Sequence, residues 1–191
     1  MTLRAVVVGI PGVGKSTVVD KVVAGYKGAK LVNFGTVMFE EALARKWVKG
    51  RDEMRKMPVE RQKRLQKAAA SRIARMTGEM VLVDTHLFIR TDEGFWPGLP
   101  FEVVRAMKPT HLVLVVAKPE EIAKRRSADS TRVRDALTNE SLLEELELAK
   151  SFLTASSTLT GAPMTIISND EGKQEEVAGR ILGMLEKAAG R

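Results

Sequence analysis

The sequence predicts an α/β fold in which a parallel sheet of five strands is covered by helices on both faces. Strands are expected at residues 3–8, 30–34, 80–84, 111–116 and 163–168, and the runs at 3–8 and 80–84 lack the polar alternation of half-exposed strands. Such runs are typical of strands that are buried on both faces. Segments with helical character lie between them, and strands that alternate with helices form right-handed βαβ units in a parallel sheet.

The helices are placed by their start and stop signals. The first follows a glycine-rich segment at residues 9–17 and ends at the break 25–28. Thr36 is predicted to be the N-cap of a helix over residues 37–47, and Pro58 can open a helix at its first position. Further helices are expected at residues 58–76, 101–107, 118–126, 139–159 and 171–189, and loops at 49–52, 91–100 and 127–136.

Length and composition indicate one domain over residues 1–191, with ample chain for a hydrophobic core. Cysteine is absent, which excludes disulfide bonds and zinc sites of the cysteine type. No apolar run is long enough to cross a membrane, and no signal-peptide pattern is present. The expected location is therefore the cytoplasm, without a membrane partner.

The formal net charge of +7 is unevenly distributed. The segment from Arg45 to Arg75 contains twelve lysines and arginines but only three acids, which gives it a local charge of +9. Such a stretch attracts polyanions, although a solvated helix face has the same composition. Aromatic residues make up only 5% of the chain, and none interleaves with these charges after Trp47. That weakens a stacking mode of single-strand binding, so nucleic acid is not the expected partner.

The glycine-rich segment has the pattern of a phosphate-binding P-loop, because it joins an apolar strand to a helix. Its glycines let backbone N–H groups point at phosphate oxygens, and the positive end of the following helix adds to that field. Lys15 would reach the β- and γ-phosphates of a nucleotide, and the Ser16 hydroxyl would bind Mg²⁺. The residues expected to bind ATP here are Gly9, Ile10, Pro11, Gly12, Val13, Gly14, Lys15, Ser16 and Thr17.

Other candidate residues follow the carboxyl ends of the predicted strands, where open α/β sheets bind ligands. Asp84 ends the third strand and is expected to bind Mg²⁺ directly or through water. His86 lies two residues further on and is expected to be an ordinary polar loop residue.

Arginines gather in residues 125–135, and planar guanidinium groups suit the charge spread of phosphoryl transfer. On a short loop they could close over the site and exclude water. Arg55 belongs to a charged turn and could bind the phosphate of a second substrate.

These motifs together resemble the archaeal type of adenylate kinase over nearly the whole chain. Besides the P-loop, the resemblance rests on residues 32–38, 52–55, 83–86, 94–100 and 125–135. It implies that ATP and AMP give two ADP with Mg²⁺, on a sheet with strand order 2-3-1-4-5. It also implies an AMP-binding region at residues 34–63, a short lid at 126–135 and a homotrimer.

The resemblance also assigns individual residues. Gly35, Thr36, Arg55 and Arg90 would contact AMP. Arg126, Arg132 and Arg134 would hold the transferring phosphoryl group together with Lys15. The backbone from Asn169 to Gly172 would line the adenine of ATP. The chain departs from the wider family at residues 84–90, which replace an Asp-Gly-Phe-Pro-Arg run, and its lid is too short for a zinc knot.

Two alternatives differ in function. Another small P-loop kinase would phosphorylate a different monophosphate or a small-molecule hydroxyl, and for the hydroxyl Asp84 could serve as the base. A nucleotide-dependent nucleic-acid-binding module would instead use the +9 stretch. No Asn-Lys-x-Asp motif occurs, which argues against a GTPase switch.

Overall fold

The computed structural model describes residues 2–91, 93–128 and 138–190, without the side chain of Arg55. Five parallel strands form the main sheet, in the order β2-β3-β1-β6-β7. Counted along the chain without the separate pair β4–β5, this is the predicted order 2-3-1-4-5. The strands of the main sheet are β1 (Leu3–Val8), β2 (Ala29–Asn33), β3 (Met80–Asp84), β6 (His111–Val116) and β7 (Met164–Ser168).

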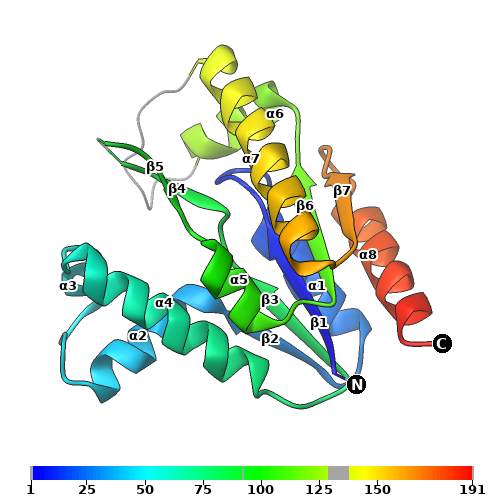
Figure 1. Cartoon of the computed structure of the whole chain (residues 1–191). Helices are drawn as coiled ribbons and strands as arrows, with labels where there is room; N and C mark the ends of the chain where they lie inside the picture. Colours follow the sequence, from blue (N-terminus) through cyan, green and yellow to red (C-terminus); the bar gives the residue numbers. More distant parts are fainter. Residues whose placement is uncertain (1, 92, 129–137, 191) are drawn as a thin grey trace.

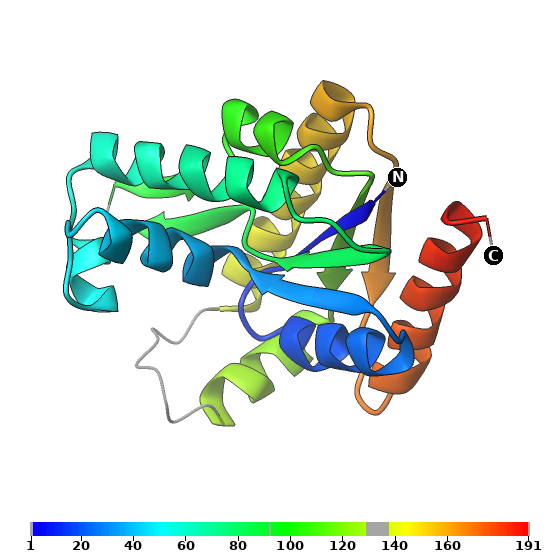
Figure 2. The same ribbon diagram turned by 90° about the horizontal axis from the view of Figure 1, so that it is seen from below.

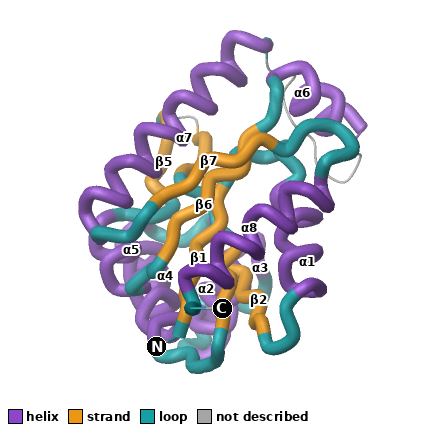
Figure 3. The backbone as a smooth tube through the Cα atoms, turned by 90° about the vertical axis from the view of Figure 1, so that its right-hand side faces the viewer, coloured by secondary structure: helices purple, strands orange, loops and turns teal. Residues whose placement is uncertain are grey.

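Helices cover both faces of this sheet, as predicted (Figures 1 and 2). Helices α1 (Lys15–Gly25) and α8 (Gln174–Ala188) pack together on one face. Helices α5 (Phe101–Met107) and α7 (Asn139–Thr160) cover the other, and α5 also packs on α4 (Val59–Ala74). In the tube view the strands run as one layer between these two sets of helices (Figure 3).

The remaining helices flank the carboxyl end of the sheet. Helices α2 (Phe34–Ala44) and α3 (Arg51–Arg55) follow β2 and form, with α4, a group that extends beyond the β2 edge (Figure 2). Helix α6 (Pro119–Ala128) follows β6. In the described part of the chain, no helix is both long and apolar enough to span a membrane.

Burial along the strands follows their position in the sheet. Every residue of β1 is buried, and β3 and β6 are buried over most of their length, whereas β2 and β7 at the edges are largely exposed. The continuous apolar runs of the sequence therefore mark the centre of the sheet.

Two expected loops are wrong. Strand β5 (Gly94–Pro97) lies inside the predicted loop 91–100, and it pairs in an antiparallel hairpin with β4 (Phe88–Thr91), most of which precedes that loop. Phe88 explains it, because its ring packs edge-on against Phe95 at 5.1 Å and against Phe152 of α7 at 5.6 Å. The other expected loop contains the start of α3, which begins at Arg51.

Candidate functional site

Residues 9–14 connect β1 to α1 and require glycine at three positions. Gly12 and Gly14 have φ angles of +92° and +78°, in the left-handed region that glycine adopts most readily. A Cβ on Gly14 would lie 2.5 Å from Nδ2 of Asn169, and one on Gly9 would lie 2.8 Å from the Val115 carbonyl oxygen. Gly14 is the N-cap of α1 and supplies no side-chain hydrogen bond, so the helix start offers N–H donors to an anion.

Lys15, the predicted catalytic lysine, is held by Asp84. The parallel pairing sets Asp84 opposite Val7 on one side and opposite Asn33 on the other. The Lys15 ammonium forms an ion pair with one carboxylate oxygen of Asp84, and Asn33 donates to the other at 2.9 Å. Lys15 is only 7% exposed, and this burial lowers the pKa of its ammonium group to about 8. Ser16 lies exposed in the first turn of α1.

Gly35 and Thr36 lie half-buried in the first turn of α2, directly after the strand that carries Asn33. The prediction of Thr36 as the N-cap is wrong, because the helix begins at Phe34 and Asn33 caps it. The Asn33 side-chain oxygen accepts from the Thr36 backbone N–H at 3.0 Å, which satisfies a donor at the helix start. One residue therefore caps α2 and orients Asp84.

Arg51 is a candidate that the sequence did not single out. It begins α3 and donates to the Thr36 hydroxyl at 2.6 Å. Its only sequence signal is its place beside the charged turn that contains Arg55. Arg55 itself lies in α3, but its side chain lies outside the described part of the structure, as do Arg132 and Arg134.

The other predicted arginines converge on one buried acid. Arg126, in α6, donates from Nε to the Pro11 carbonyl at 2.8 Å and from Nη2 to Glu145 at 2.9 Å. Arg90, in β4, donates to the second carboxylate oxygen of Glu145 at 3.4 Å. Sequence reasoning missed Glu145, because an acid within an acidic, helical stretch is indistinguishable from a solvated one.

Asn169 joins the segment after β7 to the glycine loop. Its side chain is completely buried and donates to the Val13 carbonyl at 2.8 Å. Arg125 donates to the Asn169 backbone carbonyl at 3.1 Å and to Glu121 at 2.9 Å. The segment predicted to line adenine is thus anchored to the loop predicted to hold phosphates.

His86 supports the other side of the glycine loop. Its Nδ1 lies 3.2 Å from the Gly9 carbonyl oxygen. A Cβ on Gly98, in the Pro-Gly-Leu-Pro segment, would lie 2.3 Å from the His86 carbonyl oxygen. Glycine at this position lets the segment after β5 pack directly on the backbone beside the site.

Solved structures similar to this chain include small-molecule kinases. Shikimate kinase from Bacteroides thetaiotaomicron aligns with a TM-score of 0.63 at 14% identity, covering 96% of this chain and 98% of that one. A gluconokinase from Sinorhizobium meliloti aligns with a TM-score of 0.51 at 13% identity, covering 98% and 94%. At such low identity these likenesses establish the P-loop kinase fold alone.

Comparison with known sequences identifies the family more specifically than the structural likeness does. A family model described as AAA domain matches residues 8–143. The adenylate kinase of Thermoplasma acidophilum is 43% identical over 183 residues, covering 96% of this chain and 98% of the relative. That of Pyrococcus horikoshii is 40% identical over 191 residues, covering 98% and 97%. Both matches cover nearly the whole of each chain, including the elements that carry Lys15, Asp84 and Asn169. Because the identity is about 40% over this length, the chain belongs to the adenylate kinase family.

Proposed function

We propose that the protein transfers the terminal phosphoryl group of ATP to AMP, and that ATP binds at the glycine loop and AMP at the start of α2. The observation that carries this proposal is the bridge Lys15–Asp84–Asn33, which joins the two places. Asn33 in turn holds the first turn of α2 through Thr36. The two anionic groups would then be held at the ends of β1 and β2, on either side of β3, which would bring them together for an in-line transfer between two phosphates.

On the donor side, we assign the phosphates of ATP to residues 9–17. The uncapped N–H groups at the start of α1 and the Lys15 ammonium are the donors available there. The segment from Asn169 to Gly172 would line the adenine, because Asn169 ties it to Val13 of the loop. Asn169 would support this segment through its bond to Val13 and would not contact the adenine with its side chain, which is buried.

Magnesium fits this arrangement as a companion of the nucleotide. Within the described residues, no group of three or more His, Cys, Asp or Glu side chains is arranged to hold a metal ion by itself. The Ser16 hydroxyl and the Asp84 carboxylate are the hard oxygen ligands that Mg²⁺ prefers, and phosphate oxygens and water would complete its shell. When bound, Mg²⁺ would neutralise charge on the β- and γ-phosphates.

On the acceptor side, we assign AMP to the region 34–63, with Gly35 and Thr36 in the first turn of α2 and Arg55 in α3. Arg90 would meet the AMP phosphate from β4. Arg51 already donates to the Thr36 hydroxyl, so a guanidinium group is present in this region.

The chemistry that follows is mainly positioning and charge neutralisation. Lys15 and Arg126 would offset the negative charge of the moving phosphoryl group, and Arg132 and Arg134 would add to it from a lid at residues 126–135. No general base is required, because the acceptor is already an anionic phosphate. We treat residues 1–191 as one kinase domain that contains both regions.

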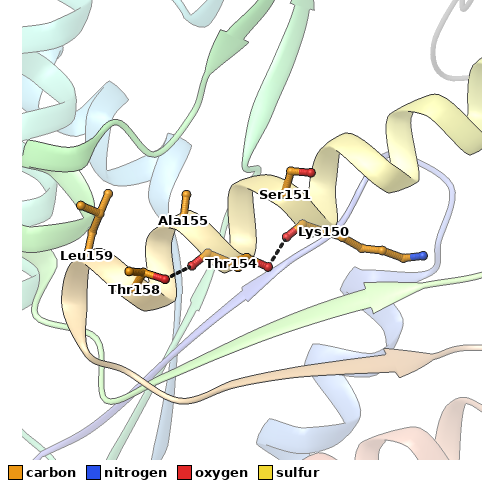
Figure 4. Close-up of a pocket in the computed structure, with 6 residues that line it drawn as sticks. All are labelled: Lys150, Ser151, Thr154, Ala155, Thr158 and Leu159. Atoms are coloured by element: carbon orange, nitrogen blue, oxygen red, sulfur yellow. Dashed lines mark hydrogen bonds between the residues drawn. The ribbon is translucent and has the colours of Figure 1, made fainter.

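We further propose that the protein forms a homotrimer. The edge strand β7 exposes Met164 and Ile166, which are 40% and 41% exposed, and Leu159 at the end of α7 is 52% exposed. On the adjacent outer surface of α7, a shallow hollow is lined by Leu159, by the small side chains of Ser151, Thr154, Ala155 and Thr158, and by Lys150 (Figure 4). Such a surface suits close packing between subunits, and sedimentation equilibrium measures the number of chains directly.

The function is tested with a panel of acceptors in the presence of ATP and Mg²⁺. We expect AMP to be converted to ADP faster than other nucleoside monophosphates, and shikimate and gluconate to remain unchanged. Lys15→Met should remove most turnover and retain the far-ultraviolet circular dichroism of the wild type. Faster phosphorylation of a hydroxyl compound than of AMP would refute the proposal and favour a small-molecule kinase.

A further inference from the structure

Glu145 is a buried carboxylate to which neither the resemblance nor the comparisons assign a role. It lies in α7 and is 4% exposed, whereas its neighbour Glu144 faces solvent. A buried carboxylate is costly unless it is paired and hydrogen-bonded. Arg126 and Arg90 supply that pairing, one to each carboxylate oxygen.

The two arginines are held to different degrees. Arg126 is 10% exposed, with Nη2 at 2.9 Å from Glu145 and Nε on the Pro11 carbonyl. Arg90 is 53% exposed, and its Nη1 lies 3.4 Å from Glu145. The carboxylate therefore fixes Arg126 against the glycine loop, whereas its contact with Arg90 is long and open to solvent.

We propose that Glu145 is a positioning residue for phosphoryl transfer, which orients Arg126 toward the donor phosphates and competes with the acceptor phosphate for Arg90. The inference rests on the proposed function, which assigns Arg126 and Arg90 to the two substrates. Its physical basis is that two guanidinium groups share one carboxylate, so the trio keeps a net charge of about +1 for an incoming anion. Glu145 thus links the donor side to the acceptor side.

Glu145→Gln is the primary test, because it keeps the size of the side chain and one oxygen acceptor but removes the charge. Loss of a group that orients a metal ligand costs about ten- to a hundredfold in activity, and we expect kcat to fall by a similar factor when Arg126 loses its orienting carboxylate. AMP measured alone by calorimetry should bind more tightly, because the uncharged amide no longer competes for Arg90. Glu144→Gln removes a charge from the same helical turn at an exposed position and should change neither quantity.

A double-mutant cycle with Arg90 isolates the competition between Glu145 and the AMP phosphate for this arginine. In an Arg90→Ala background, Glu145→Gln should no longer tighten AMP binding, whereas its effect on kcat through Arg126 should persist. Glu145→Asp retains the charge and should recover part of the lost kcat.

Other outcomes would overturn the inference. An ion pair that serves stability alone would lower the melting temperature of Glu145→Gln and leave kcat and AMP affinity at 25 °C unchanged. Weaker AMP binding in this variant would contradict the competition. If wild-type protein fails to convert AMP and ATP into ADP, the proposed function fails irrespective of Glu145.

The wild-type protein offers a test that does not depend on the folding of a variant. In spectra of ¹⁵N-labelled arginine side chains, AMP should shift the Arg90 signal, because the acceptor phosphate draws it from Glu145. The Arg126 Nε signal should stay in place, since its bond to Pro11 is not on the acceptor side. An unchanged Arg90 signal at saturating AMP would refute the competition.

Discussion

Binding of ATP to this protein should take up a proton at alkaline pH, because of the environment of Lys15. Burial lowers the pKa of the Lys15 ammonium to about 8, whereas an unperturbed lysine titrates near 10.4. Phosphate oxygens favour the charged form of the lysine, so ATP should raise this pKa toward its ordinary value. The part of the affinity that depends on charged Lys15 is complete below pH 8 and is lost as the pH rises above it.

The size of the effect follows from the two pKa values. At pH 9, about one molecule in ten carries a charged Lys15 before ATP is added, so binding should take up about 0.9 proton. Between pH 7 and pH 9 the affinity for ATP should fall about tenfold. Phosphate groups themselves lose their last proton near pH 6 and do not contribute in this range.

Calorimetry in two buffers with different ionisation enthalpies measures the proton uptake directly. The Lys15→Met variant should take up no proton, whereas Lys21→Met, which removes a partly exposed lysine from the same helix, should behave as wild type. Spectra of ¹³C-labelled lysine side chains give the pKa of Lys15 without ATP. A Lys15 signal that titrates at or above pH 10, or binding at pH 9 without proton uptake, would refute the reasoning.

Three further changes test other parts of the structure. Arg4→Met removes a buried guanidinium group that donates to the carbonyls of Ala74, the last residue of α4, and of Lys108, directly after α5, both at 3.0 Å. We expect the free energy of unfolding to fall by about 2–4 kcal/mol, measured as a fall of about 5–15 °C in melting temperature, with kcat at 25 °C retained. Gly98→Ala should lose about 1–3 kcal/mol in urea unfolding because its Cβ meets the His86 carbonyl, whereas Gly50→Ala, with open space around its Cβ, should stay within about 0.5 kcal/mol. Arg55→Ala should weaken AMP binding about ten- to a hundredfold and leave ATP binding nearly unchanged in separate titrations, and an equal loss for both nucleotides would contradict a distinct acceptor region.

The main sheet could be predicted from sequence because its strands carry their own signal. The apolar runs of β1, β3 and β6 mark strands that have neighbours on both sides, and burial follows those runs closely. The hairpin β4–β5 could not be predicted, because its stability depends on ring contacts with Phe152 about sixty residues away. Local turn signals at Gly94 and Pro97 indicate a break in the chain but do not reveal what the flanking residues pack against.

The residues of the candidate site likewise fall into those that a local pattern predicts and those that only the folded structure reveals. Residues that a local pattern singles out, such as Lys15 after its glycines and Asp84 at its strand end, could be proposed from sequence, and the structure brings these two side chains together. Asn33 lies in the segment 32–38 that supports the resemblance, but its role as both cap and partner of Asp84 depends on the pairing of β2 with β3. Glu145 gave no signal, because only the packing of α7 against α6 brings it to Arg126.

The distribution of acids explains how several cations can share one site. Four cations are each paired with a carboxylate, which offsets the repulsion between neighbouring positive charges. The pairing orients the buried Lys15 and Arg126, whereas the contact of Arg90 is long and open to solvent. These four cations share three acids, so the group keeps a net charge of about +1 and still attracts phosphate. Replacing any one of these acids should therefore affect activity more through the orientation of its cation than through the total charge. Substitutions that keep the size of the side chain, such as Glu145→Gln, are for this reason the most informative. The pairs are Lys15 with Asp84, Arg125 with Glu121, and both Arg126 and Arg90 with Glu145.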